Sequence, residues 1–316
     1  MKKEAVILLN MGGPNNLDEV ELFLTNMFQD KNILTMKSDM LRSFVGGMIT
    51  FMRTENSQDI YKQIGGKSPI VGHTKNLVEK LQKKLGEEVI VDFVMRYTPP
   101  FADEVIARLN EEDVDKIYLI PLYPQQSTTT TKSSLEDFES HYHNSEGDAV
   151  LVEIKHFFQN ETYNRSILQS IKNEMNSSSY NDFDIIFSAH GLPQKIVDSG
   201  DVYQKHILRH LKILKEMMLK ESMLFHDVHL AYQSKVGPMA WLKPSLSEKL
   251  HTIRNRGVII FPIAFTIDNS ETDFELEIEY REIAEDYGFK EYKVCRCPND
   301  SDLFVEALQE IYEKMK

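Results

Sequence analysis

The stretch VIIFPIAFTIDNSETDFELEIEYREIAEDY, residues 258–287, combines two patterns from which the fold can be argued. Residues 258–265 form a continuous apolar run, which is typical of a strand buried on both faces of a sheet. The Asp-Asn-Ser string at 268–270 contains good N-cap residues, so the acidic segment 271–287 is expected to be a long helix. A buried strand that leads into a helix predicts a layered α/β protein.

The expected helix carries a row of carboxylates. At roughly 100° per residue, one face holds Glu271, Glu275, Glu279, Glu282 and Asp286. Such a row is often a solvated face, but apolar residues flank it on both sides here, which places it on the arc that faces protein. Several carboxylates cannot all be ionised there without a cation or a proton. The pattern therefore indicates a path for protons or metal ions.

The composition is that of an ordinary globular protein with room for two domains. The 316 residues are 41% hydrophobic and 27% charged, with a net charge of −13 that disfavours nucleic acid as a partner. The apolar run after Glu4 is short and is predicted to be a first strand rather than a signal peptide. Cys295 and Cys297 cannot alone supply the four ligands of an iron–sulfur cluster. We expect no such cluster and a reducing, cytoplasmic location.

Strand-like apolar runs alternate with amphipathic helical patterns along the chain. The apolar runs are 5–10, 89–95, 116–122, 150–157, 184–190, 228–233 and 258–265. The helical patterns are 17–28, 73–85, 102–109, 161–175, 201–220 and 271–287. This alternation predicts parallel sheets with ligands bound at the carboxyl ends of the strands.

The loops after these strands come in matching pairs, which indicates two related halves. The string ILLNMGGP at 7–14 resembles IFSAHGLP at 186–193, so Met11 and His190 hold the same place. We expect two similar Rossmann-like halves, each a parallel sheet flanked by helices, with a cleft between them. The predicted domains are 1–155 and 156–316, the second holding the acidic helix and a last helix that either stays there or packs back on the first half.

The first half contains extra residues, which must lie in 29–72. This segment is rich in Met and Phe, a composition that fits a core helix, a flap that grips a flat apolar ligand, or a contact with a membrane surface. The string GGKS at 65–68 is similar to part of a phosphate-binding loop. It lacks the preceding glycine and the strand that such a loop needs, so nucleotide binding is disfavoured.

Several residues at strand ends could carry chemistry. His190 ends an expected strand and precedes a glycine, and Glu271 in the same half would favour its protonated form. Arg96 and Tyr97 come from the other half and could equally be structural anchors. Further candidates that also have a packing or capping explanation are Tyr123, the hydroxyl-rich loop 127–131 and Trp241.

The strings that hold these residues resemble the ferrochelatase family, whose members insert ferrous iron into a porphyrin in haem synthesis. The strings are LLNMGGP at 8–14, IGGKSP at 64–69, MRYTPP at 95–100, PLYPQQS at 121–127, SAHGLP at 188–193, YQSKVGP at 232–238, WLKP at 241–244 and DNSET at 268–272. Each is weak alone. Together, in the family's order, they cover almost the whole chain.

The resemblance implies a role for individual residues. His190 is the implied active-site histidine and Glu271 its partner carboxylate, both of which would meet the ferrous substrate. Glu275 and Glu279 are the implied path for protons or metal. The implied porphyrin-binding residues are Met11, Arg53, Ser68, Arg96, Tyr97, Tyr123 and Trp241. Pyrrole protons must leave as the metal enters, so a base and a chain of carboxylates fit the reaction. Iron is a substrate, and no permanent cofactor is implied.

Some positions depart from the family's pattern. This chain has Asn269 where the family often has histidine, and Gln126 where it usually has tyrosine. It has Lys235 in place of an arginine and Ala240 in place of an acidic residue. Two alternative functions stay open: a chelatase for another tetrapyrrole or metal, and a two-lobed protein that holds haem without chemistry. The expected partners are a porphyrin and ferrous iron, with or without peripheral membrane contact through the flap. The oligomeric state is open.

Overall fold

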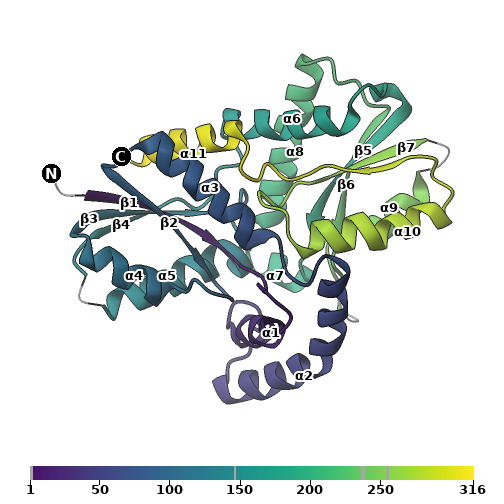
Figure 1. Ribbon diagram of the computed structural model, residues 1–316. Helices are drawn as coiled ribbons and strands as arrows, with labels where there is room; N and C mark the ends of the chain where they lie inside the picture. Colours follow the sequence, from purple (N-terminus) through teal and green to yellow (C-terminus); the bar gives the residue numbers. More distant parts are fainter. Residues whose placement is uncertain (1–2, 146, 236–238, 254–255) are drawn as a thin grey trace. The chain divides into compact units, whose positions relative to one another are not determined.

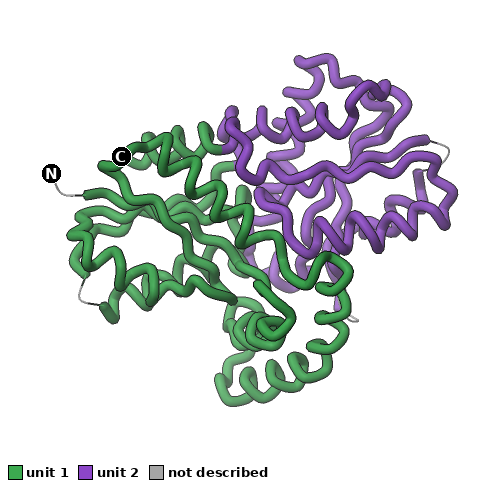
Figure 2. The backbone as a smooth tube through the Cα atoms, viewed as in Figure 1, with its two compact units in different colours: residues 1–157, 305–316 green, residues 158–304 purple. Residues whose placement is uncertain are grey.

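The computed structural model describes residues 3–145, 147–235, 239–253 and 256–316. Residues 236–238 of the 232–238 string lie outside these ranges. The chain divides into two compact units (Figure 2), which are called unit 1 (Met1–Phe157 with Val305–Lys316) and unit 2 (Phe158–Phe304). Each unit contains one four-stranded sheet in which every strand pairing is parallel.

The sheet of unit 1 has the order β2-β1-β3-β4. Its strands are β1 (Lys3–Asn10), β2 (Val89–Met95), β3 (Val114–Pro121) and β4 (Val150–Glu153). Residues 5–9 of β1 are at most 1% exposed, because helices cover both faces of the sheet (Figure 1). On one face, alternate β1 residues share a core with the inward side chains of α4 (Ala102–Glu111) and α5 (Ser133–His143).

The opposite face of this sheet is covered by α3 (Ile70–Leu85) and by the final helix α11 (Asp302–Met315) (Figure 1). The ring of Tyr312 in α11 lies edge-on to Tyr118 of β3, with centroids 5.0 Å apart. The Tyr312 hydroxyl also donates a hydrogen bond to Glu4 of β1. The end of the chain therefore packs on the sheet formed by its beginning.

The remaining helices of unit 1 lie near the carboxyl ends of the strands. They are α1 (Glu19–Gln29), α2 (Asp39–Gln63) and a short π-helical turn, η1 (Thr128–Lys132). The α2 helix occupies most of the extra segment 29–72 and packs on α1. Its Met- and Phe-rich side faces solvent, since six apolar side chains are exposed: Met40, Leu41, Phe44, Met48, Phe51 and Met52. The explanation of this segment as a core helix is therefore wrong.

Unit 2 repeats the strand order of unit 1, as β6-β5-β7-β8. Its strands are β5 (Phe183–His190), β6 (Asp227–Gln233), β7 (Gly257–Pro262) and β8 (Tyr292–Val294). Its helical elements are α6 (Glu161–Met175), η2 (Tyr180–Asp182), α7 (Gln194–Asp198), α8 (Tyr203–Lys220), α9 (Leu246–Thr252), η3 (Glu271–Glu279) and α10 (Tyr280–Asp286). The predicted fold of two similar α/β halves with parallel sheets is confirmed.

Several element boundaries differ from the sequence predictions. Strand β7 ends at Pro262 rather than at residue 265, because the chain turns there, with the Phe265 N–H donating to the Pro262 carbonyl at 3.1 Å. Strand β4 ends at Glu153, and the short β8 was not predicted. The expected helix 271–287 is a π-helix, η3, followed by the α-helix α10. Among the described residues, no helix is both long and apolar enough to cross a membrane.

Candidate active site

The carboxyl end of β5 and the first turn of η3 bring His190 and Glu271 together. His190 is the last residue of β5, and Glu271 opens η3 after β7. The imidazole Nδ1 of His190 lies 2.8 Å from a carboxylate oxygen of Glu271. Tyr203 of α8 donates its hydroxyl to the His190 carbonyl at 3.0 Å and fixes the strand end. The His190 side chain is 38% exposed.

The end of β6, next to β5 in the sheet, supplies hydrogen bonds to two carboxylates of η3. The Ser234 N–H donates to Glu275 at 2.7 Å, and the Ser234 hydroxyl lies within hydrogen-bond distance of both Glu271 and Glu275. The Gln233 amide donates to Glu275 at 3.1 Å. Gln233 is itself oriented by Ser188 of β5, whose hydroxyl donates to its carbonyl oxygen at 2.8 Å. A single hydroxyl proton thus serves two neighbouring carboxylates.

These contacts shift the pKa values of the site in different directions. Burial works against a charged His190, but the charge and hydrogen bond of Glu271, with Glu275 further off, raise the pKa of His190. Burial likewise opposes ionisation of Glu271, but His190 and Ser234 hold its pKa below the usual value. Burial and the charge of Glu271 raise the pKa of Glu275 to about 7. The site therefore favours protonation of His190 and ionisation of Glu271, and adds a carboxyl group, Glu275, with a pKa of about 7.

Beyond these two residues the carboxylate row leaves the protein interior. Glu279, Glu282 and Asp286 are exposed. The side chains that face the sheet belong to the adjacent row, Thr272, Leu276, Tyr280 and Ala284. The prediction that the whole stripe faces protein is wrong, because the apolar row can fill the core without desolvating unpaired charges.

In unit 1, a tight turn that follows β1 contacts the segment that follows β2. Gly12 has φ +83°, and a Cβ there would lie 2.4 Å from the Thr98 hydroxyl oxygen, so the turn requires glycine. The Tyr97 N–H donates to the Met11 carbonyl at 3.0 Å, and the Ser68 N–H donates to the Pro14 carbonyl at 2.8 Å. The strings at 8–14, 64–69 and 95–100 thus meet at one edge of the sheet.

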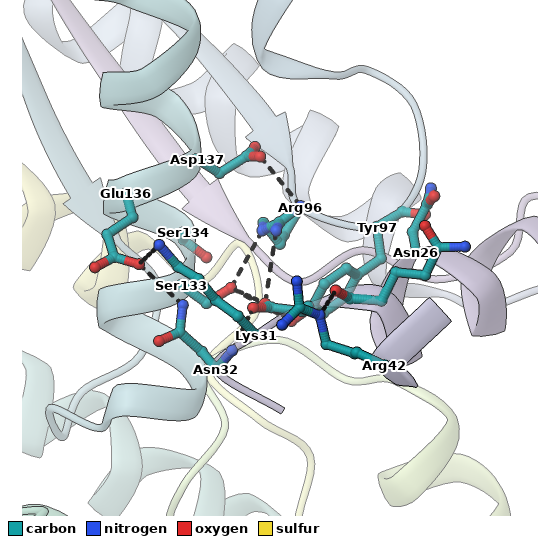
Figure 3. A network of polar contacts seen from close by, with 12 residues as sticks. Asn26, Lys31, Asn32, Arg42, Arg96, Tyr97, Ser133, Ser134, Glu136 and Asp137 are labelled. Atoms are coloured by element: carbon teal, nitrogen blue, oxygen red, sulfur yellow. Dashed lines mark hydrogen bonds and ion pairs between the residues drawn. The ribbon is translucent and has the colours of Figure 1, made fainter. Parts of the chain in front are cut away.

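A network of polar contacts at this edge includes Arg96, Tyr97, Ser133 and Asp137 (Figure 3). The buried carboxylate of Asp30, at the end of α1, belongs to this network. It accepts hydrogen bonds from the Tyr97 hydroxyl at 2.8 Å and from the Ser133 hydroxyl. The Arg96 guanidinium lies 3.6 Å from Asp30 and 3.1 Å from Asp137 of α5. Burial and the Asp30 charge raise the pKa of Tyr97 well above its usual range. Arg96 and Tyr97 are therefore held within unit 1 by a network of hydrogen bonds and ion pairs.

Comparison with known proteins places the chain among proteins of one kind. The family model described as Ferrochelatase matches residues 3–316. A protein named Ferrochelatase from Sulfurimonas denitrificans is 69% identical over 316 residues, which is 100% of both chains. Another from a Nitratiruptor species is 50% identical over 99% of this chain and 100% of its own. The chain belongs to the ferrochelatase family.

Solved structures resemble the chain at the level of the fold. The sirohydrochlorin chelatase SirB from Bacillus subtilis subspecies spizizenii, in complex with cobalt, superposes with a TM-score of 0.60. The match covers 99% of this chain and 95% of SirB, at 8% sequence identity. A likeness at this identity extends the two-half architecture beyond the ferrochelatases and carries no information on the substrate of this chain.

The remaining residues to which the ferrochelatase resemblance points lie in different settings. Tyr123 is buried, with its hydroxyl 3.1 Å from that of Ser134, and burial raises its pKa far above the usual range. Ser68 is also buried, whereas Met11 and Arg53 are half-buried, with the Arg53 guanidinium 5.8 Å above the Phe28 ring. Trp241 is half-buried against Gly191, the residue after His190. Met11, Arg53 and Trp241 are thus the accessible members of the set.

Side chains that could ligate a metal lie only in groups of one or two in the described part of the chain. No set of three or more His, Cys, Asp or Glu residues there could hold a metal ion. The pair His190 and Glu271 offers one nitrogen and one carboxylate.

Sequence reasoning missed Ser188, Gln233, Ser234 and Asp30. A signal existed for two of them, since Gln233 ends β6 and Ser234 follows it, as Met95 ends β2 and Arg96 follows it in the repeat. Asp30 gave no signal because it lies in the inserted segment, without a counterpart in the second half. Its contacts with Arg96, Tyr97 and Ser133 span residues 30 to 133 and arise only on folding.

Proposed function

We infer that this chain is a ferrochelatase, a lyase of haem biosynthesis that inserts ferrous iron into protoporphyrin IX or a related porphyrin and releases two protons. The observation that carries this conclusion is the match to the ferrochelatase family over residues 3–316. The hydrogen-bonded pair of His190 and Glu271 at the carboxyl end of β5 gives the reaction a base. Membership of this family also disfavours a chelatase for another tetrapyrrole and a haem-binding protein without chemistry.

The reaction must move two pyrrole protons to water as iron enters the ring. We propose that the neutral form of His190 accepts a pyrrole proton and that Glu271 stabilises the imidazolium that results. Glu271 and Glu275 share the Ser234 hydroxyl, so a proton can pass between them. A carboxyl with a pKa of about 7 can both take and release that proton near neutral pH. Glu279, exposed one turn later, would deliver it to solvent.

The same pair is proposed to meet the metal. The Glu271 carboxylate and the free ring nitrogen of His190 are hard-to-borderline ligands that suit ferrous iron. They would hold it only during transfer to the porphyrin nitrogens, which take over as ligands. No permanent cofactor is proposed. Burial raises the pKa of the Cys295 and Cys297 thiols well above the usual range, and neutral thiols are poor ligands for an iron–sulfur cluster.

Unit 1 is proposed to supply most of the porphyrin-binding surface. Met11 and Arg53, both half-buried, would contact the ring and one acidic substituent. Ser68, Arg96, Tyr97 and Tyr123 would shape the wall behind them, since their side chains are buried or engaged in the Asp30 network. In unit 2, Trp241 would add an aromatic contact next to His190.

We further propose that the exposed side of α2 rests on a membrane surface. Its apolar side chains recur at positions 40, 41, 44, 48, 51 and 52, which is the spacing of one helical face. An exposed apolar face of this kind is unusual on a monomeric protein and fits an interfacial helix. The protein would then be cytoplasmic with peripheral membrane association.

An anaerobic assay of iron insertion with purified protein tests the assignment. Wild type should convert protoporphyrin to haem, and His190→Ala and Glu271→Gln should lower kcat by about 100-fold or more. Lys212→Ala is the control, since its side chain is 79% exposed on α8. A wild type that leaves the porphyrin metal-free would overturn the activity. Two variants as fast as wild type would overturn the site and leave the family assignment intact.

A further inference from the structure

The segment that follows β8 is bonded to the loop that precedes η3. Asn299 donates its backbone N–H to the Thr266 carbonyl at 2.9 Å. Its side-chain oxygen accepts the Asp268 N–H at 2.8 Å, and its side-chain nitrogen donates to the Asp268 carboxylate at 2.7 Å. Asn299 adopts φ +50°, a left-handed conformation that asparagine tolerates better than most residues. Three hydrogen bonds from one residue therefore fix this loop.

The Asp268 carboxylate is fully buried, with 1% of its side chain exposed. Its first oxygen accepts the Cys297 N–H at 2.9 Å. Its second oxygen accepts from Asn299 and lies 3.6 Å from the Arg296 guanidinium. A buried charge is costly unless it is paired and hydrogen-bonded, as it is here. The segment 295–299 thus supplies three polar partners of this carboxylate, Arg296, Cys297 and Asn299.

The loop held in this way leads directly to Glu271. The side-chain oxygen of Asn269 accepts the Glu271 N–H at 2.8 Å, and the Asn269 carbonyl accepts the Asp273 N–H at 3.0 Å. Asp273, in the first turn of η3, also pairs with Arg296 at 2.5 Å. The segment 295–299 therefore fixes the start of η3 from two sides. Asn269, where the family's pattern often has histidine, here accepts the N–H of the first residue of that helix.

We propose that Asn299 is a positioning residue for iron insertion, which acts through Asp268 to hold Glu271 at hydrogen-bond distance from His190. The proposal rests on the role proposed above for Glu271. Asn299 does not touch the pair itself. It sets the loop from which Glu271 starts, and a displacement of about 1 Å in such a group can cost about 100-fold in rate. The effect should fall on kcat, because porphyrin binding is assigned to other residues.

The test compares two glycine variants. Asn299→Gly keeps the left-handed backbone and removes both side-chain bonds to Asp268. Asn176→Gly is the matched control, because Asn176 also has a positive φ, +48°, and is an exposed residue of unit 2. We expect Asn299→Gly to lower kcat about tenfold or more with the KM for porphyrin unchanged, and Asn176→Gly to leave both unchanged. A kcat for Asn299→Gly within about twofold of wild type would overturn the proposal.

A double variant separates positioning from a general loss of structure. If Asn299 acts through Glu271, then Asn299→Gly combined with Glu271→Gln should be no slower than Glu271→Gln alone. Losses that multiply would overturn the proposal. If Asn299→Gly does not fold, Arg296→Met replaces it, since that side chain is 65% exposed. The kcat of Arg296→Met should fall at least about threefold, and an unchanged kcat would overturn the proposal. Wild-type activity in Glu271→Gln would instead contradict the proposed role of Glu271 and leave the proposed activity intact.

Discussion

Ser234 donates its backbone N–H to one carboxylate oxygen of Glu275 at 2.7 Å, and its hydroxyl reaches the other. Forty-one residues separate the two in the chain. Ser234 holds φ +64°, a conformation that a residue with a Cβ rarely adopts, and this aims its N–H and hydroxyl at the same carboxyl group. The site thus stores local backbone strain where it binds a carboxyl group whose pKa is about 7.

Removing the Ser234 hydroxyl should slow iron insertion. In Ser234→Gly the backbone conformation and the N–H bond to Glu275 remain, while Glu271 and Glu275 lose their shared donor. We expect kcat to fall about tenfold. Because this hydrogen bond lowers the pKa of Glu275, its loss should also move the titration of Glu275 to higher pH.

The matched control for Ser234→Gly is Ser222→Gly. Ser222 also has a positive φ, +57°, but lies exposed beyond the end of α8. Steady-state kinetics of both variants across neutral pH test whether the Ser234 hydroxyl takes part in iron insertion. Equal rates in the two variants would show that the hydroxyl has no part in the reaction.

Glu275→Gln should stabilise the protein at alkaline pH. The pKa of Glu275 rises on folding from 4.5 to about 7, so the unfolded chain ionises first as pH increases. The free energy of unfolding therefore falls between these two pH values and stays low above them. Glutamine cannot ionise, so the variant should gain up to about 3 kcal/mol near pH 8 and nothing near pH 4.

Urea unfolding at both pH values measures this difference. Glu282→Gln is the control, since Glu282 is exposed on α10 and should show no such pH dependence. A Glu275→Gln variant that is less stable than wild type at alkaline pH would show that the hydrogen bonds of the carboxylate outweigh the cost of its charge.

Asp30→Asn should destabilise unit 1. The carboxylate accepts from Tyr97, Ser133 and the Asn32 N–H and balances part of the Arg96 charge. Removing one partner of a buried charged network leaves the others uncompensated, which typically costs about 3 kcal/mol. Urea unfolding of Asp30→Asn against Asp59→Asn, whose side chain is 59% exposed, checks this. Equal stability of the two would mean that Arg96 is sufficiently neutralised by Asp137.

Charges on the exposed side of α2 should abolish membrane binding. We expect wild type to cosediment with vesicles of phosphatidylcholine and phosphatidylglycerol, and the double variant Phe44→Glu with Phe51→Glu to bind at least about tenfold more weakly. Leu219→Glu is the control, because Leu219 is a 69% exposed apolar residue on α8. If the double variant binds vesicles as wild type does but has a raised KM for porphyrin, the face grips the substrate instead.

The sequence by itself determined the alternation of strands and helices, the repeat and the family. Continuous apolar runs such as residues 5–9 are buried on both faces of a sheet, a local signal that needs no knowledge of neighbours. The placement of His190 and Glu271 could be predicted because both follow strands of one parallel sheet, whose carboxyl ends meet at one edge.

Only the tertiary structure decided which carboxylates are buried and what holds them. An ideal helical spacing places Glu279 beside Glu275, but the packing of Leu276 and Tyr280 on the sheet turns Glu279 to solvent. The bonds from Ser234 to Glu275 and from Asn299 to Asp268 join segments far apart in the chain. No local sequence pattern predicts such contacts, because the partner of each residue depends on how the strands pair in the sheet. The pKa of Glu275 depends on these contacts and follows from the fold.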